Sequence, residues 1–305
     1  MSLVTKIKTN MKNYFVLKQN FGFIKANKVL IKKLLMGGKD GETTELIKIS
    51  NDIFKDILLK YKNVSTLENE KYNFPNRIFV FWWDGFSAAP RIVQDCLKSI
   101  HKFNKFFEVI ELDKHNLNNY IDKKNKIYLR FIQGKISVQN FSDYLRMYLI
   151  YNFGGFWIDS TYLFLADFDL KKLLKNRNFS SIYTEKSSVF FGKKNPTCWN
   201  GNFIGGLKGN ALSHAFIDCF EYYYDNFKST YTYFMIDFII YSCFYFGVDN
   251  NVLKKTEFID GDIFYISQTG YKNINEYKQI KVPQKLSYRD QISEEFYNFI
   301  EDILS

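Results

Sequence analysis

The chain has 305 residues, of which 46% are hydrophobic and 24% are charged, so it can bury a large core and need not be disordered. Sixteen glycines and four prolines exclude collagen-like and low-complexity classes, and the 19% aromatic share needs a core or flat ligands to cover the rings. The net charge of +10 indicates an anionic partner, either a surface or a nucleic acid.

The first 36 residues form the pattern of a basic amphipathic helix. They contain eight lysines and no acid, with apolar residues between the lysines at roughly helical spacing. Such a helix can lie on an anionic membrane, where each lysine adds about 1 kcal/mol. The alternative is a helix that packs on the body with its lysines solvated. We expect residues 1–70 to be a helical N-terminal segment, with a break at 37–41 and a second amphipathic helix over 47–61.

Residues 71–305 are expected to form a single α/β domain. The aromatic run over 78–83 has strand length, residues 92–100 place apolar side chains on one helical face, and 107–112 is typical of another strand. This strand, helix and strand order favours a sheet with parallel neighbours.

A helix over 136–153 follows, closed by two glycines, and a short buried strand over 156–158 ends at Asp159. Ligands of open α/β sheets bind beyond the carboxyl ends of strands, so this carboxylate is placed for chemistry. Asp143 and Arg146 are neighbours on the helix and interrupt its apolar pattern. By themselves these two residues could form a local ion pair. The glycine stop and the strand ending in Asp159 that follow them in the sequence favour a binding site instead.

Three further patterns have both a structural and a functional interpretation. Asp237 lies within the apolar run 234–246, which is shorter than the ~20 residues of a membrane-spanning helix; it is either a structural hydrogen-bond partner or a catalytic carboxylate. A literal DXD at 167–169 is interpreted as structural, because Asp167 precedes 168–174 as a helix cap would. The glycines of 205–209 match no phosphate-binding pattern and are interpreted as a turn.

Zinc sites and disulfide frameworks are not expected. The four cysteines stand far apart without a CxxC pair, and the three histidines form no HExxH pair, so a reducing cytosol fits best. No secretory signal is visible at the start of the chain.

Residues 140–161 resemble the SDxLRxxLLxxxGGxWxD signature of glycosyltransferases with a DXD-type site, and they are most similar to the capsular polysaccharide synthesis proteins within glycosyltransferase family 32. Residues 82–100 (WWDGFSAAPRIVQDCLKSI) are similar to a second block of that group, in the same order and spacing. The resemblance is firm over about 75–165 and looser to about 290, and residues 1–70 lie outside it.

The resemblance implies a GT-A-like, Rossmann-type nucleotide-sugar-binding domain and retention of anomeric configuration. An aromatic ring of Trp82 or Trp83 would lie near the base, or these rings would belong to the core. Asp143 and Arg146 match positions that bind the donor sugar or diphosphate. Asp159 matches the first Asp of the DXD motif and would face the diphosphate through Mn²⁺ or Mg²⁺.

One position departs from the general pattern. Thr161 stands where the motif has its second acid, so it offers a neutral ligand and leaves the metal requirement open. Lys285 belongs to a segment that looks like a later family block, which adds it to the donor-binding candidates. The candidate catalytic residues are Asp159 and Asp237, and Asp159 is the candidate metal ligand.

The expected function is a retaining glycosyltransferase of capsular or cell-surface polysaccharide synthesis. It would move a hexose from a UDP- or GDP-sugar to a lipid-linked saccharide acceptor, in the cytoplasm and peripherally on the inner face of the plasma membrane. One rival is a protein that binds an anionic surface or nucleic acid, but the basic excess lies outside the body and no nucleic-acid motif is present, so no nucleic-acid partner is expected. A second rival is an inactive glycosyltransferase-like scaffold, because Thr161 replaces an acid.

Overall fold

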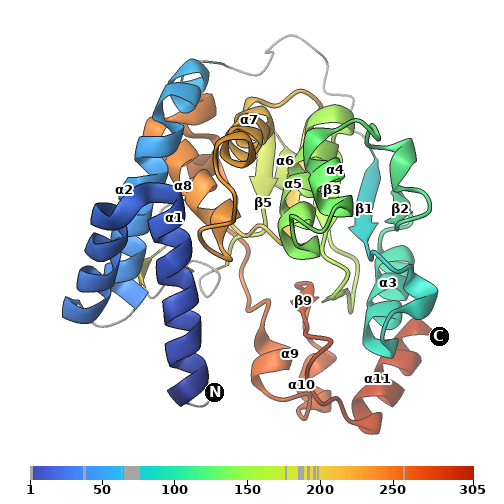
Figure 1. Cartoon of the computed structure of the whole chain (residues 1–305). Coiled ribbons are helices and arrows are strands. Elements are labelled where there is room, and N and C mark those ends of the chain that lie inside the picture. The colour runs from blue at the N-terminus through green and yellow to red at the C-terminus, as the bar shows by residue number, and fades with distance from the viewer. Residues whose placement is uncertain are drawn as a thin grey trace.

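The computed structural model has a central mixed sheet with helices on both faces (Figure 1). The residues that the structure describes are 3–36, 39–62, 64, 76–175, 177–184, 189–190, 193–194, 197, 199–256 and 258–305. The expected boundary between residues 70 and 71 lies outside the described residues, as do Gly37 and Gly38 of the expected break.

The sheet has five strands: β1 (Arg77–Phe81), β2 (Glu108–Leu112), β3 (Gly155–Ile158), β5 (Phe179–Ser181) and β8 (Phe203–Gly206). They lie in the order β2-β1-β3-β8-β5. The first three are parallel, with Ile78 of β1 opposite Val109 of β2 and Phe156 of β3, and β8 is antiparallel to both of its neighbours. The predicted strands and their parallel pairing are therefore confirmed, and the chain has a mixed α/β fold compatible with a Rossmann-like arrangement.

Helices and short strands surround the sheet. They are α3 (Arg91–Phe103), α4 (Lys126–Ile132), α5 (Val138–Phe153), α6 (Leu170–Leu174), α7 (Ala211–Asn226), α8 (Met235–Phe246), α9 (Tyr265–Gln268), α10 (Ile274–Tyr277), α11 (Glu294–Leu304), β4 (Tyr162–Leu163), β6 (Val189–Phe190), β7 (Lys193–Lys194) and β9 (Gln284–Lys285), with 3₁₀ turns at Phe86–Ala88, Leu117–Asn119 and Val248–Lys255. The predicted helix over 136–153 begins at Val138 because the Ser137 hydroxyl accepts a hydrogen bond from the backbone N–H of Asn140 at 3.3 Å. It ends at Gly154, whose φ of 66° suits glycine.

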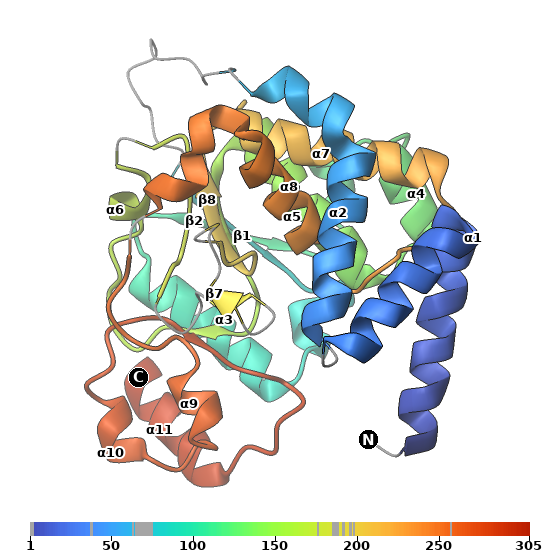
Figure 2. The ribbon, with the colours of Figure 1, turned by 90° about the vertical axis from the view of Figure 1, so that its left-hand side faces the viewer.

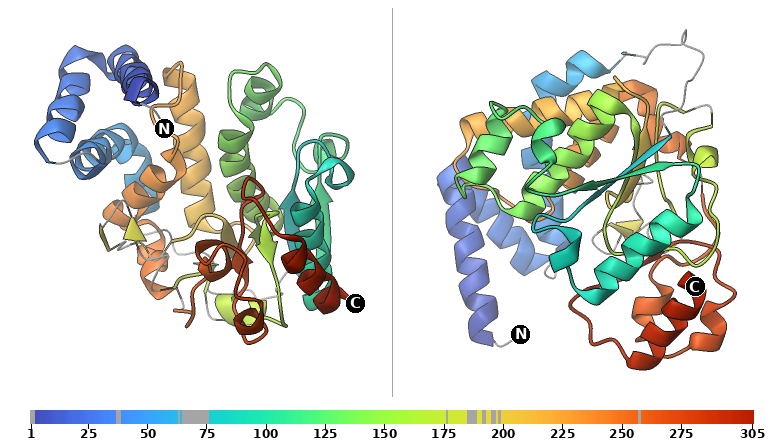
Figure 3. Two further views of the ribbon diagram at one scale, coloured as in Figure 1. Left: turned by 90° about the horizontal axis from the view of Figure 1, so that it is seen from below. Right: turned by 90° about the vertical axis from the view of Figure 1, so that its right-hand side faces the viewer.

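The sheet separates two hydrophobic cores. Along β1, Phe79 and Phe81 face one core while Ile78 and Val80 face the other, as the alternation of a strand requires. Residues of α5, α7 and α8 complete the first core, and residues of α3 and α11 complete the second. Figure 3 shows this layering, with the sheet between α4 and α5 on one side and α3 on the other. At the carboxyl ends of the parallel strands β1, β2 and β3, the chain leaves the sheet after Phe81, Leu112 and Ile158.

Two N-terminal helices lie against the first core. α1 (Leu3–Leu35) bends at Gly22, whose φ of 82° and ψ of 169° are not helical, and it packs on α2 (Lys39–Leu58). α2 continues into a 3₁₀ turn over Leu59–Tyr61 and packs against α8 and α7 (Figure 2). None of the helices in the described part of the chain is long and apolar enough to cross a membrane.

The prediction of a break over residues 37–41 is wrong for residues 39–41, because α2 begins at Lys39 and contains Gly41. A Cβ atom on Gly41 would overlap the carbonyl of Lys32 in α1. The glycine therefore permits a close approach of the two helices rather than a turn.

Two other local expectations need correction. The cap of α6 is Asp169, which accepts from the N–H of Lys172 at 3.2 Å, and not Asp167. Gly205 and Gly206 are not in a turn but in strand β8, where a side chain would overlap Phe156 or Ile150. Close packing of this strand therefore accounts for the two glycines, and the expected turn is confined to residues 208 and 209.

Candidate active site

Several of the predicted site residues lie together at one edge of the sheet, at the carboxyl ends of the parallel strands. β1 and β3 are parallel neighbours, so Trp82 and Asp159, which follow their last residues, lie at the same edge. Helix α5 brings Asp143 and Arg146 to this edge, and β9 brings Lys285 there through its pairing with β4. Elements far apart in the sequence thus bring their charged groups together.

Arg146 is the central cation of this cluster. Its guanidinium lies 3.0 Å from Asp143 Oδ1 and 3.7 Å from Asp159 Oδ1, and its side chain is only 10% exposed. It also donates to the carbonyl oxygen of Gly201 and lies over the Trp157 ring at 5.4 Å from the centroid. A buried guanidinium between two carboxylates is both neutralised and fixed in orientation.

Asp159 is the carboxylate that keeps its charge. It accepts hydrogen bonds from Trp157 Nε1 at 2.8 Å and from Lys285 Nζ at 3.2 Å. Burial opposes ionisation, but Lys285, Arg146 and the Trp157 hydrogen bond outweigh it and hold the pKa of this carboxyl below its ordinary value. Asp159 is therefore an anion at neutral pH, with a side chain that is 24% exposed.

The other two acids of the cluster bind protons more tightly. Burial raises the pKa of Asp143 to about 7 despite Arg146, and the nearby Asp237 and Asp159 carboxylates add to the rise. Burial also raises the pKa of Asp237 to about 6, against the hydrogen bond that Trp199 Nε1 donates to its Oδ1 at 3.0 Å. The structural hydrogen bond considered for Asp237 is thus present, and its pKa lies in the range of a general base at neutral pH.

Lys285 joins the C-terminal region to this cluster. Its ammonium donates to Asp159 and also to Thr161 Oγ1, and it lies 5.6 Å from the centroid of the Tyr162 ring. The backbone of Lys285 pairs with Tyr162 across the β4–β9 ladder. The predicted donor-binding residues on α5, after β3 and on β9 therefore form one connected network.

The two tryptophans after β1 have different surroundings. Trp83 packs edge-on against Phe131 at 4.7 Å between ring centroids, in contact with the first core. Trp82 meets Tyr288 edge-to-face at 5.3 Å, and the Tyr288 side chain is 40% exposed. Trp82 is thus the ring of this pair that contacts the C-terminal segment next to Lys285.

Two tryptophans of the site were not predicted as site residues. Trp157 lies two residues before Asp159, so strand alternation could have placed both side chains on one face. Trp199 binds Asp237 across 38 residues of sequence, and no local pattern signals such a contact.

The donor set at Asp159 does not fit a divalent cation. One oxygen of Asp159 accepts from Trp157 and the other from Lys285, and Thr161 is neutral. Hard cations need several oxygen ligands, and no group of three or more His, Cys, Asp or Glu within the described residues is arranged to hold a metal ion. The cation expected from the resemblance stays a prediction.

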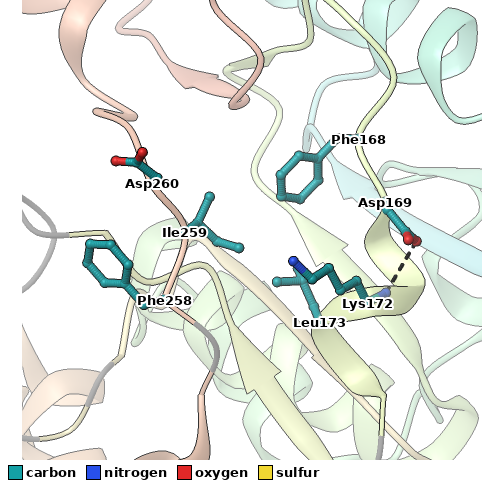
Figure 4. A pocket seen from close by; sticks show the side chains of 7 residues that line it. All are labelled: Phe168, Asp169, Lys172, Leu173, Phe258, Ile259 and Asp260. Atoms are coloured by element: carbon teal, nitrogen blue, oxygen red, sulfur yellow. Dashed lines mark hydrogen bonds between the residues drawn. The ribbon is translucent and has the colours of Figure 1, made fainter.

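A separate pocket of about 330 Å³ lies between α6 and the segment 258–260 (Figure 4). Its lining residues are Phe168, Asp169, Lys172, Leu173, Phe258, Ile259 and Asp260, so it includes none of the predicted site residues. The literal DXD at 167–169 touches this pocket through Phe168 and Asp169, and the Asp169 carboxylate caps α6. The structural interpretation of this motif agrees with that bond.

Comparison with known proteins adds one match. A family model described as capsular polysaccharide synthesis protein matches residues 39–302, which include every predicted site residue. The expectation that residues 1–70 lie outside the resemblance is therefore wrong for residues 39–70. No curated protein and no solved structure gives a significant match.

Proposed function

The chain belongs to the capsular polysaccharide synthesis protein family, and from this premise we propose that it is a retaining glycosyltransferase of the GT-A type, within glycosyltransferase family 32. It would transfer a hexose from a UDP- or GDP-sugar to a saccharide acceptor. The observation that carries the proposal is the buried network of Asp143, Arg146, Asp159 and Lys285 at the carboxyl ends of the parallel strands. Sheets of this class bind nucleotides at such an edge.

In this proposal the two cations serve the diphosphate. Glycosyl transfer breaks the bond between the anomeric carbon and the diphosphate oxygen, and negative charge develops on the departing group. Arg146 and Lys285, preorganised by Asp143 and Asp159, would stabilise that charge without reorganisation. The carboxylates would also accept hydrogen bonds from sugar hydroxyls.

Asp237 would act on the acceptor. Its pKa of about 6 leaves it mostly ionised at neutral pH yet able to take a proton, so it can orient or deprotonate an acceptor hydroxyl. The hydrogen bond from Trp199 holds the carboxylate in place.

Trp82 and Tyr288 would flank the nucleotide base. Their edge-to-face contact joins the end of β1 to the C-terminal segment, and Tyr288 keeps an exposed ring surface. Flat rings of this kind cover a base with little loss of side-chain entropy.

The acceptor would be lipid-linked, because α1 offers a surface suited to an anionic membrane. After Gly22, six apolar residues recur at helical spacing along one face, and all are exposed by 38% to 76%. They are Phe23, Ile24, Leu30, Ile31, Leu34 and Leu35. Lys28 is exposed beside this stripe, while Lys25 and Lys33 pair with Asp52 and Glu42 of α2. An outward apolar stripe with an exposed lysine beside it, on a docked helix, suits a peripheral position on the inner face of the plasma membrane.

The test is the release of nucleoside diphosphate from a panel of UDP- and GDP-sugars by the whole chain. We expect turnover of at least one donor and a loss of about 100-fold or more in Asp159→Asn, because an interaction with developing charge is removed. Asp169→Asn is the matched control: it changes an acid of the literal DXD, and asparagine also caps helices.

Two outcomes would contradict the proposal. Wild-type turnover in a folded Asp159→Asn variant would reject the site. Binding of a nucleoside diphosphate without turnover of any donor, with a range of saccharide acceptors present, would favour the inactive scaffold instead.

A further inference from the structure

The ammonium of Lys285 occupies the position between the two residues of the DXD-type motif. It lies 3.2 Å from Asp159 Oδ2 and donates to Thr161 Oγ1, so it bridges the first and third positions of the Asp159-Ser160-Thr161 segment. A cation held between the motif residues and a diphosphate would sit in this same space. The protein therefore already places a positive charge there.

We propose that Lys285 takes the role of a divalent cation, so that this chain binds the diphosphate of its nucleotide sugar without a metal ion. The inference rests on the proposed glycosyltransferase function and specifies how its donor is held. This role also accounts for Thr161 at the position where the motif has its second acid. An ammonium carries one positive charge where a divalent ion carries two, so the single carboxylate of Asp159 balances it.

The backbone holds Lys285 in this position. The N–H of Leu286 donates to the carbonyl oxygen of Thr161 at 2.9 Å, which ties β9 to the residue that the ammonium contacts. The fully buried side chain of Gln284 donates to Asp262 O at 2.9 Å and accepts from Ile266 N–H at 3.2 Å. Bonds on both sides of Lys285 thus fix the strand, and the lysine side chain needs little ordering when a ligand binds.

The ammonium also retains capacity for a ligand. It has three N–H groups, and within the described residues Asp159 and Thr161 accept two of them. Its side chain is 20% exposed, so the remaining N–H can reach a phosphate oxygen from the solvent side. Arg146 lies 3.7 Å from the same Asp159 carboxylate, which places a second cation beside this point.

The test measures binding of UDP and of GDP by titration calorimetry, in excess EDTA and again with MnCl₂. We expect the wild type to bind one of them in EDTA, with a dissociation constant that MnCl₂ changes by less than about twofold. Lys285→Met should weaken this binding by about tenfold or more, and Lys285→Arg should keep most of it, because both cations donate to phosphate. Lys126→Met is the control, since it breaks an ion pair of 3.0 Å between Lys126 on α4 and Asp225 on α7, outside the network.

A second variant tests the role by exchange. Thr161→Asp combined with Lys285→Ala restores the second acid and removes the ammonium, so its UDP or GDP binding should require MnCl₂, with Mn²⁺ binding visible by electron paramagnetic resonance. The wild-type measurement stands even if this variant fails to fold.

The outcomes separate the two proposals. Wild-type binding that is lost in EDTA and restored by MnCl₂ overturns the role of Lys285 and leaves the glycosyltransferase proposal intact. Unchanged binding in a folded Lys285→Met variant does the same. A wild type that binds neither UDP nor GDP under either condition contradicts both.

Discussion

Three carboxyl groups lie within the electrostatic influence of one buried guanidinium, and their pKa values diverge because their other surroundings differ. Asp159 has two cations and an indole N–H to stabilise its charge, so its pKa falls below the ordinary value. Asp143 has Arg146 alone among further acids, and Asp237 has a neutral indole donor, so burial dominates and both pKa values rise. The cluster thus provides one permanent anion and two groups that exchange protons near neutral pH.

The stability of the protein should reflect Asp237. Its folded pKa of about 6 exceeds the unfolded value of about 3.9, so the folded state binds the proton more tightly. The corresponding stability is present below about pH 4 and is lost as the pH rises through about 6. Asp237→Asn removes the buried charge and should raise the free energy of unfolding at pH 8, by on the order of 1 to 3 kcal/mol, with little change at pH 4. Urea unfolding at both pH values measures this, and an equal effect at both would contradict it.

Arg146 should matter for folding as well as for the donor. Arg146→Ala leaves Asp143 and Asp159 without their shared partner, and loss of one side of a buried ion pair costs about 3 to 5 kcal/mol. We expect a smaller loss at pH 5 than at pH 8, because Asp143 is protonated at pH 5. Thermal unfolding of this variant at both pH values measures the difference. A loss independent of pH would mean that packing on Trp157, and not charge, dominates.

At the scale of elements, α1 combines a docked face with an exposed one. Ala26 and Val29 are buried against the neighbouring structure, and the apolar stripe defined above points outward. The sequence predicted a basic amphipathic helix, but it could not predict the bend at Gly22 or the pairing of two lysines with α2, because both depend on tertiary contacts. The helix packs on the body, as the second interpretation requires, and its contact with a membrane stays a prediction.

The exposed face should bind anionic vesicles. We expect Ile24→Asp combined with Leu35→Asp to reduce sedimentation with phosphatidylglycerol vesicles by about tenfold, since two apolar side chains exposed by 71% and 76% become charged. Wild-type binding should weaken as salt shortens the ~10 Å screening length.

Phe106→Asp is the control for this test, because Phe106 is 86% exposed on the body and belongs to no such stripe. Equal vesicle binding by wild type and the double variant would show that the stripe does not contact lipid. A change of mass in light scattering would assign it to contact between copies of this chain.

At the scale of the whole molecule, the sequence predicted individual helices and strands better than the contacts between elements that are distant in the chain. Strand and helix periodicity identified β1, α3, β2, α5 and β3 within a few residues, because each depends on local pattern and on a cap or glycine stop. The proximity of Asp159 and Arg146 followed from the helix that leads into β3. The contacts of Lys285 and Trp199 did not, because they cross 126 and 38 residues and depend on how distant elements pack.

The pairing of β4 with β9 has a consequence for synthesis of the protein. Asp159 and Lys285 are 126 residues apart, so at about 5 to 20 residues per second the ribosome needs roughly 6 to 25 s between them. During that interval the nascent chain can form the parallel strands and α5, but the carboxylate of Asp159 lacks its lysine. The charge network is therefore completed late in translation, and nascent chains that stop before Lys285 cannot contain it.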